Sequence, residues 1–89
     1  MTIKVEVFSS PGCGKCGHAR DVLHRLADEL GGDRIHWREV NILEELDYAV
    51  ALGVLSTPAI AIDDELTFVS LPSAKRLRAE LLRRLEESN

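Results

Sequence analysis

A closely spaced pair of cysteines is the most reactive feature of this sequence. Cys13 and Cys16 are the only cysteines among 89 residues, and Gly14 and Lys15 separate them. A close cysteine pair can exchange disulfides, supply half of a metal site or fill a core. Two cysteines form at most one bridge within the chain, which is too few for the disulfide framework of a secreted miniprotein.

Metal binding is the main alternative to redox chemistry. A structural zinc site normally takes four Cys or His ligands. His18 raises the number in this segment to three, whereas His24 and His36 lie elsewhere in the sequence. Haem attachment requires a histidine directly after the second cysteine, and residue 17 is glycine. We therefore expect no metal and no cofactor, and we favour thiol–disulfide chemistry.

The spacing of apolar residues along the sequence changes at the cysteines. Residues 3–8 alternate apolar and polar side chains, which predicts a strand, and "SSPG" ends it. From the cysteines to Leu30 the apolar residues recur every three or four positions, which predicts a helix. Gly31 and Gly32 end that helix. Its apolar face is expected to contain Cys16, Ala19, Leu23, Leu26 and Leu30.

A second strand and a second helix are predicted next. Residues 34–40 form the weaker strand pattern. Asn41 is predicted to cap a helix, Glu44 completes a capping-box pattern three residues later, and Gly53 ends the helix. Its apolar surface is expected to come from Leu46, Ala49, Val50 and Leu52.

The last part of the chain predicts a hairpin and a helix. Residues 59–62 and 66–69 are short strands, and Asp63 and Asp64 suit the tight turn between them. A final helix is expected to begin near residues 70–73, with a proline tolerated in its first turn. The side chains expected to be buried are Ala74, Leu77, Leu81 and Leu85.

The predicted order is βαβαββα, an α/β fold with a four-stranded mixed sheet and helices on both faces. The first connection crosses over through a helix, so the first two strands are expected to be parallel. The last two strands form an antiparallel hairpin. A chain of this length with 45% hydrophobic residues is expected to form one domain, residues 1–89. Functional groups should gather at the carboxyl end of the first strand, where the cysteines lie.

The two cysteines are predicted to differ in reactivity. Cys16 is in register with the buried face of the first helix, whereas Cys13 lies at or just before its first turn. Unpaired backbone N–H groups and the positive end of the helix dipole favour a thiolate there, and Lys15 adds a positive charge. We expect Cys13 to attack a substrate disulfide and Cys16 to resolve the mixed disulfide.

The combination of "CGKC" with "GVLSTPAIAI" at residues 53–62 resembles the thioredoxin-like superfamily. Length and element order are most similar to its glutaredoxin-sized members. The resemblance implies a thioredoxin-like fold and a disulfide oxidoreductase. It also implies a cis bond before Pro58, which would face the redox pair and leave the backbone of Thr57 free to pair with an extended substrate.

Several positions depart from the family pattern. Gly12 stands where thioredoxins usually have tryptophan, Lys15 where they have proline, and Val7 where they bury an acid. Glu6 is adjacent to Val7 but should point to the other face of the sheet. After the fourth strand, "SLPSAKR" lacks the glycines and the acid of a glutathione site. The resemblance then implies protein disulfides as substrates and a dithiol protein or a flavin-dependent reductase as electron donor.

Composition bears on location and partners. The net charge of −4 argues against a general attraction to nucleic acid. No apolar stretch approaches the roughly 18 residues that span a membrane, and "MTIKVEVF" does not have the pattern of a secretory leader. We expect a cytoplasmic monomer. A redox-sensing or protein-binding module of the same fold, without sustained turnover, is the alternative function.

Overall fold

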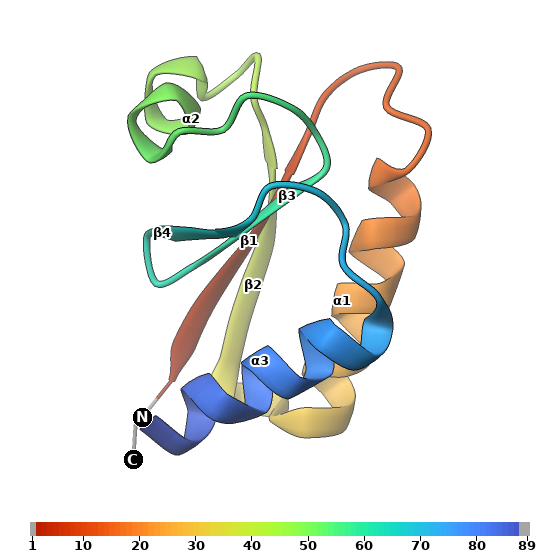
Figure 1. The fold of residues 1–89 in the computed structure, drawn as a ribbon, viewed down its shortest axis with the longest axis vertical. Coiled ribbons are helices and arrows are strands. Elements are labelled where there is room, and N and C mark those ends of the chain that lie inside the picture. The colour runs from red at the N-terminus through yellow and green to blue at the C-terminus, as the bar shows by residue number, and fades with distance from the viewer. Residues whose placement is uncertain (1, 88–89) are drawn as a thin grey trace.

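The computed structural model describes residues 2–87, and the elements follow the predicted βαβαββα order (Figure 1). A single 3₁₀ turn, η1, precedes the second strand. The bounds are β1 Ile3–Ser9, α1 Cys16–Leu30, η1 Gly32–Arg34, β2 Ile35–Asn41, α2 Leu46–Leu52, β3 Ala59–Ile62, β4 Glu65–Phe68 and α3 Ala74–Glu87.

The four strands form one mixed sheet in the order β2-β1-β3-β4. β1 runs parallel to β2, and β3 and β4 form an antiparallel hairpin, as predicted. β1 also pairs antiparallel with β3, with Phe8 opposite Ala59. Asp63 and Asp64 make the hairpin turn with φ of 49° and 65°, a left-handed conformation that aspartate tolerates better than most residues.

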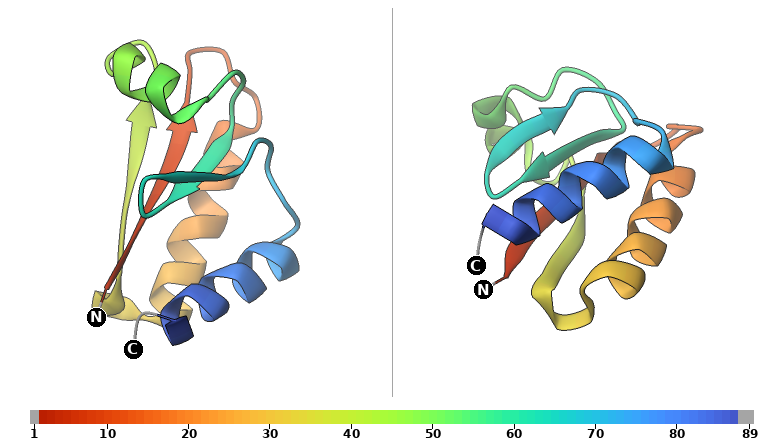
Figure 2. Two further views of the ribbon diagram at one scale, coloured as in Figure 1. Left: turned by 60° about the vertical axis from the view of Figure 1, so that its left-hand side comes forward. Right: turned by 60° about the horizontal axis from the view of Figure 1, so that its bottom comes forward.

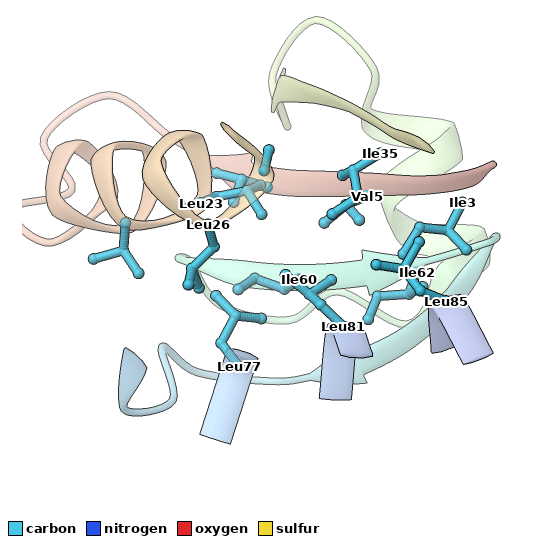
Figure 3. Packing of buried hydrophobic residues seen from close by; sticks show 13 residues of the cluster. Ile3, Val5, Leu23, Leu26, Ile35, Ile60, Ile62, Leu77, Leu81 and Leu85 are labelled. Carbon is cyan, nitrogen blue, oxygen red and sulfur yellow. The ribbon is translucent and has the colours of Figure 1, made fainter. Parts of the chain in front are cut away.

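The two faces of the sheet carry different layers (Figure 2). α1 and α3 cover one face, and their apolar side chains pack against alternate residues of β1 and β3. Figure 3 shows the α3 side chains Leu77, Leu81 and Leu85 directed at Ile60 and Ile62. The burial of these three leucines confirms the prediction for the last helix. The prediction for Ala74 is wrong: it is exposed, because it is the first residue of α3 and lies beyond the edge of this core.

α2 covers the opposite face and begins later than predicted. Asn41 ends β2 instead of capping a helix, and its side-chain oxygen accepts a hydrogen bond from the Leu43 N–H at 2.9 Å. Residues 42–44 form a turn instead of the first turn of a helix, so α2 starts only at Leu46. Gly53 ends it in the left-handed region at φ 92°, as predicted. The large apolar side chains exposed on this short helix are Leu46 and Val50, at 54% and 65%, so of the four residues expected to form its apolar surface only Ala49 is fully buried.

A buried carboxylate ties α2 to the sheet. Glu6 is 1% exposed and lies on the face away from α1, as predicted. It accepts hydrogen bonds from Tyr48 of α2 and from Arg38 Nε of β2, the latter at 2.9 Å. Arg38 also pairs with Glu45, and the Tyr48 hydroxyl also reaches Asp64 at 3.1 Å. Burial first, and then the two neighbouring carboxylates, raise the pKa of Tyr48 above its ordinary value.

Within residues 2–87, the helices are all too short or too polar to cross a lipid bilayer.

Candidate active site

The loop between β1 and α1 is shaped by a tight turn that its sequence specifies. The Cys13 N–H donates to the Ser10 carbonyl at 3.2 Å, and Gly12 between them has φ of 79°. Pro11 fixes the second position of the turn, and the third position needs a positive φ, which glycine adopts without strain. The turn sends the chain back toward the sheet and places Cys13 immediately ahead of α1.

Cys13 and Cys16 are joined by a disulfide across the start of α1, with Cα atoms 5.5 Å apart. Cys16 is the first residue of the helix and is 5% exposed, whereas Cys13 is half-buried in the loop. Lys15 occupies the N-cap position, is exposed, and makes no side-chain hydrogen bond to the helix start. The first N–H groups of a helix lack intrahelical acceptors, so this end of α1 presents positive potential to the bridge.

The proline segment lies beside the same loop. The Thr57–Pro58 bond is cis, which confirms the expectation from the resemblance. Pro58 is buried, and β3 begins at the next residue, opposite Phe8 near the end of β1. Because β3 runs antiparallel to β1, β3 starts at the end of the sheet where β1 finishes. The proline segment and the loop after β1 therefore lie at the same end of the two strands (Figure 1).

A side-chain hydrogen bond joins these two segments. The hydroxyls of Ser10 and Thr57 are 2.7 Å apart in a partly buried position. Sequence reasoning treated Ser10 only as part of the end of the first strand and missed this contact. The available signal was a hydroxyl residue between the strand and the cysteines, but its partner lies 47 residues away. The bond ties the loop of Cys13 to the residue that precedes Pro58.

The underside of the site is apolar. Val7 is fully buried among side chains of α1 and α3, and Glu6 is directed to the other face. Glu6 is the sole buried acidic or basic side chain within residues 2–87. Protons that leave or reach Cys16 therefore have no buried carboxylate on this side of the sheet. His18, on the first turn of α1, is exposed.

In the part of the chain that the structure describes, no three His, Cys, Asp or Glu side chains gather as a metal site would require.

The chain is similar to known thioredoxins over most of its length. A family model described as a thioredoxin domain matches residues 1–82. A protein named probable thioredoxin from Methanothermobacter thermautotrophicus is 35% identical over 77 residues, which cover 86% of this chain and 89% of that protein. A thioredoxin from Methanocaldococcus jannaschii is 29% identical over 83 residues, covering 93% and 96% of the two chains. A segment amounting to 10% of an Arabidopsis thaliana NADPH-dependent thioredoxin reductase is 33% identical over 54 residues, 61% of this chain.

Solved structures show the same fold at lower identity. A thioredoxin from Malassezia sympodialis superposes with a TM-score of 0.80 at 20% identity, over 94% of this chain and 76% of that one. A thioredoxin variant from Halobacterium salinarum gives a TM-score of 0.77 at 21% identity, over 91% and 73% of the two chains. Both confirm the expected α/β fold.

Proposed function

This chain belongs to the thioredoxin family and is a thiol–disulfide oxidoreductase, and we propose that Cys13 is its attacking thiol and Cys16 its resolving thiol. The observation that carries this assignment is their unequal exposure across the start of α1. A substrate disulfide can approach the half-buried Cys13, whereas Cys16 is 5% exposed and can reach little besides the sulfur of Cys13.

The exchange proceeds in two balanced steps. The Cys13 thiolate attacks one sulfur of the substrate disulfide, a Cys13–substrate disulfide forms, and the other substrate sulfur leaves as a thiolate. The Cys16 thiolate then attacks the Cys13 sulfur, the Cys13–Cys16 bridge forms, and the second substrate thiolate is released. Two electrons pass from the dithiol to the substrate. The helix start and Lys15 favour the Cys13 thiolate, which is the nucleophile of the first step.

The proline segment holds the substrate. Thr57 precedes the buried Pro58 and is tied through its hydroxyl to Ser10 in the cysteine loop. Its backbone is proposed to pair with an extended segment next to the substrate disulfide, which would bring that disulfide to Cys13. Gly12 shapes the loop through its positive φ, and a Cβ at this position would meet open space.

Protein disulfides are the proposed substrates, and a thioredoxin reductase, a flavin-dependent enzyme, is the proposed electron donor. The similarity to a segment of a plant protein named as a thioredoxin reductase supports such a donor. The proposed location is the cytoplasm and the proposed state a monomer. Continued turnover with the reductase separates a carrier from a redox sensor, which would switch state only once for each oxidation.

Substitution of each cysteine tests the assignment. With a disulfide-bonded peptide as substrate, Cys13→Ser should abolish exchange, whereas Cys16→Ser should accumulate a mixed disulfide that mass spectrometry places on Cys13. Retention of full dithiol turnover by Cys16→Ser would show that the roles are wrongly assigned. Gly14→Ala is a matched control between the two cysteines, because its side chain would meet open space, and it should keep turnover.

A further inference from the structure

An open groove of about 380 Å³ lies between α1, the helix that begins at Cys16, and α3. Val22 and Leu26 of α1 line its floor and are only 5% and 6% exposed. Val22 is six residues after Cys16, which corresponds to about 9 Å along a helix axis. A partner docked at Cys13 could therefore place a neighbouring segment in this groove.

The rim of the groove is basic. Arg25, Lys75 and Arg78 stand around it with one carboxylate, Glu29. Arg78 is paired with Glu29 at 3.1 Å, while neither Arg25 nor Lys75 forms an ion pair with another residue in the range 2–87. Three cations against one anion leave a local charge of +2, in a chain whose net charge is −4. The groove is thus a local exception to an acidic molecule.

We propose that this groove binds an acidic segment of a redox partner protein, one that combines carboxylates with apolar side chains. The proposal rests on the proposed function, since it treats the groove as a second contact for proteins that exchange disulfides with Cys13. The carboxylates would pair with Arg25 and Lys75, and the apolar side chains would lie against Ala74, the exposed apolar residue of the lining, above Val22 and Leu26. Nucleic acid fits less well, because no aromatic side chain lines the groove for base stacking.

Binding can be measured without redox chemistry. The probe is a short fluorescent peptide of alternating glutamate and leucine without cysteine, followed by anisotropy at low and high salt. Lys75→Glu should lower its affinity at least fivefold, because an exposed ion pair contributes up to about 1 kcal/mol and the reversed charge adds repulsion. Affinity should also fall as salt shortens the screening length to about 8–10 Å at physiological ionic strength.

Arg76→Glu is the matched control. Arg76 is adjacent in sequence to Lys75 and the substitution changes the charge equally, but its guanidinium lies 5.6 Å from the ring of Phe68, away from the groove. It should leave peptide affinity nearly unchanged. Absence of peptide binding, equal losses in both variants, or tighter binding of a polyuridine oligonucleotide would each overturn the proposal.

A second readout connects the groove to exchange. Two disulfide peptides are compared, one followed by the glutamate–leucine segment and the other by a serine–glycine segment of equal length. The wild type should reduce the acidic substrate with the higher kcat/KM, Lys75→Glu should lose that preference, and reduction of the neutral substrate should be unaffected. Equal kcat/KM for both substrates in the wild type would refute the proposal that the groove binds an acidic segment of the substrate. Failure to reduce either substrate would instead refute the proposed function, and the anisotropy result would still decide the groove.

Discussion

Replacing Tyr48 by phenylalanine removes one oxygen from the contact between α2 and the sheet. The Tyr48 hydroxyl donates to Glu6, and its ring lies 5.9 Å from that of Phe8. Phenylalanine keeps the ring and its packing. The substitution therefore measures what the hydroxyl contributes to folding through its bond to the buried Glu6 and its 3.1 Å contact with the exposed Asp64.

The expected loss follows from the surroundings of Glu6. A hydrogen bond to a charged group contributes about 1.5–3 kcal/mol. Arg38 Nε remains 2.9 Å from the other carboxylate oxygen, so Glu6 keeps a charged partner and the lower part of that range applies. We expect Tyr48→Phe to lower the free energy of unfolding by about 1.5–2 kcal/mol. For a domain of this size, about 4–8 °C per kcal/mol converts this to a Tm lower by roughly 6–16 °C.

Urea unfolding of the oxidised protein measures this loss, with Glu6→Gln as the reference background. The same tyrosine substitution in that background removes a neutral hydrogen bond to residue 6, with the exposed Asp64 as the other partner, and should cost less, about 0.5–1.5 kcal/mol. A loss below about 0.5 kcal/mol in the wild-type background, which falls short of even a neutral hydrogen bond, would refute the reasoning.

The pH dependence provides an independent check on the same hydroxyl. Its pKa is raised in the folded protein, so the unfolded chain loses this proton first as pH rises through about 10. The stability that the hydroxyl contributes is complete below that pH and declines above it, and Tyr48→Phe should lack this decline. Tyr48 is the only tyrosine in the chain, so tyrosinate absorbance reports it alone. Titration of the native protein at the ordinary value of about 10 would contradict the structure.

Three further predictions concern the site and α3. The rate of Cys13 alkylation in the reduced protein should reach half its maximum at a pH below about 8.5, the ordinary cysteine value, and Lys15→Gln should move that midpoint upward; a wild-type midpoint at or above 8.5 would contradict thiolate stabilisation at the helix start. Pro58→Ala should raise KM for a protein disulfide more than it slows Cys13 alkylation, and equal effects on both would exclude a docking role. The Arg83 hydrogen bond, and then that of Arg84, lower the pKa of Glu80, so its contribution to stability is present above pH about 4.5 and is lost as pH falls through the lower folded value. Glu80→Gln should flatten the acid limb of the stability curve measured by urea unfolding, and an unchanged limb would show that this ion pair does not contribute.

Local periodicity predicted the strands and helices where burial is one-sided. Apolar and polar side chains alternate over residues 3–8 because β1 lies between two different layers. The leucines of α3 recur at helical spacing because one face of that helix packs against the sheet. The cis bond at Pro58 came from the resemblance, since composition near a proline does not decide its isomer.

Other features depend on contacts between distant residues. Glu6 meets Tyr48 across 42 positions and Ser10 meets Thr57 across 47, so neither pair leaves a pattern in the neighbouring sequence. The position of β3 beside β1 is likewise a property of the assembled sheet. The wrong start of α2 has a local cause, because Asn41 can bond within a turn as readily as it caps a helix.

The central place of β1 and β3 determines how the redox site can open. The cysteine loop leaves the end of β1, the proline segment enters β3, and these two strands pair with each other in the interior of the sheet. Amide hydrogens of Phe8 and Ala59 should then exchange with solvent only through global unfolding, whereas those of the short α2 can exchange through local opening. The two strands that carry the cysteine loop and the proline segment should thus separate only when the whole fold unfolds, so the two halves of the redox site stay on one rigid base.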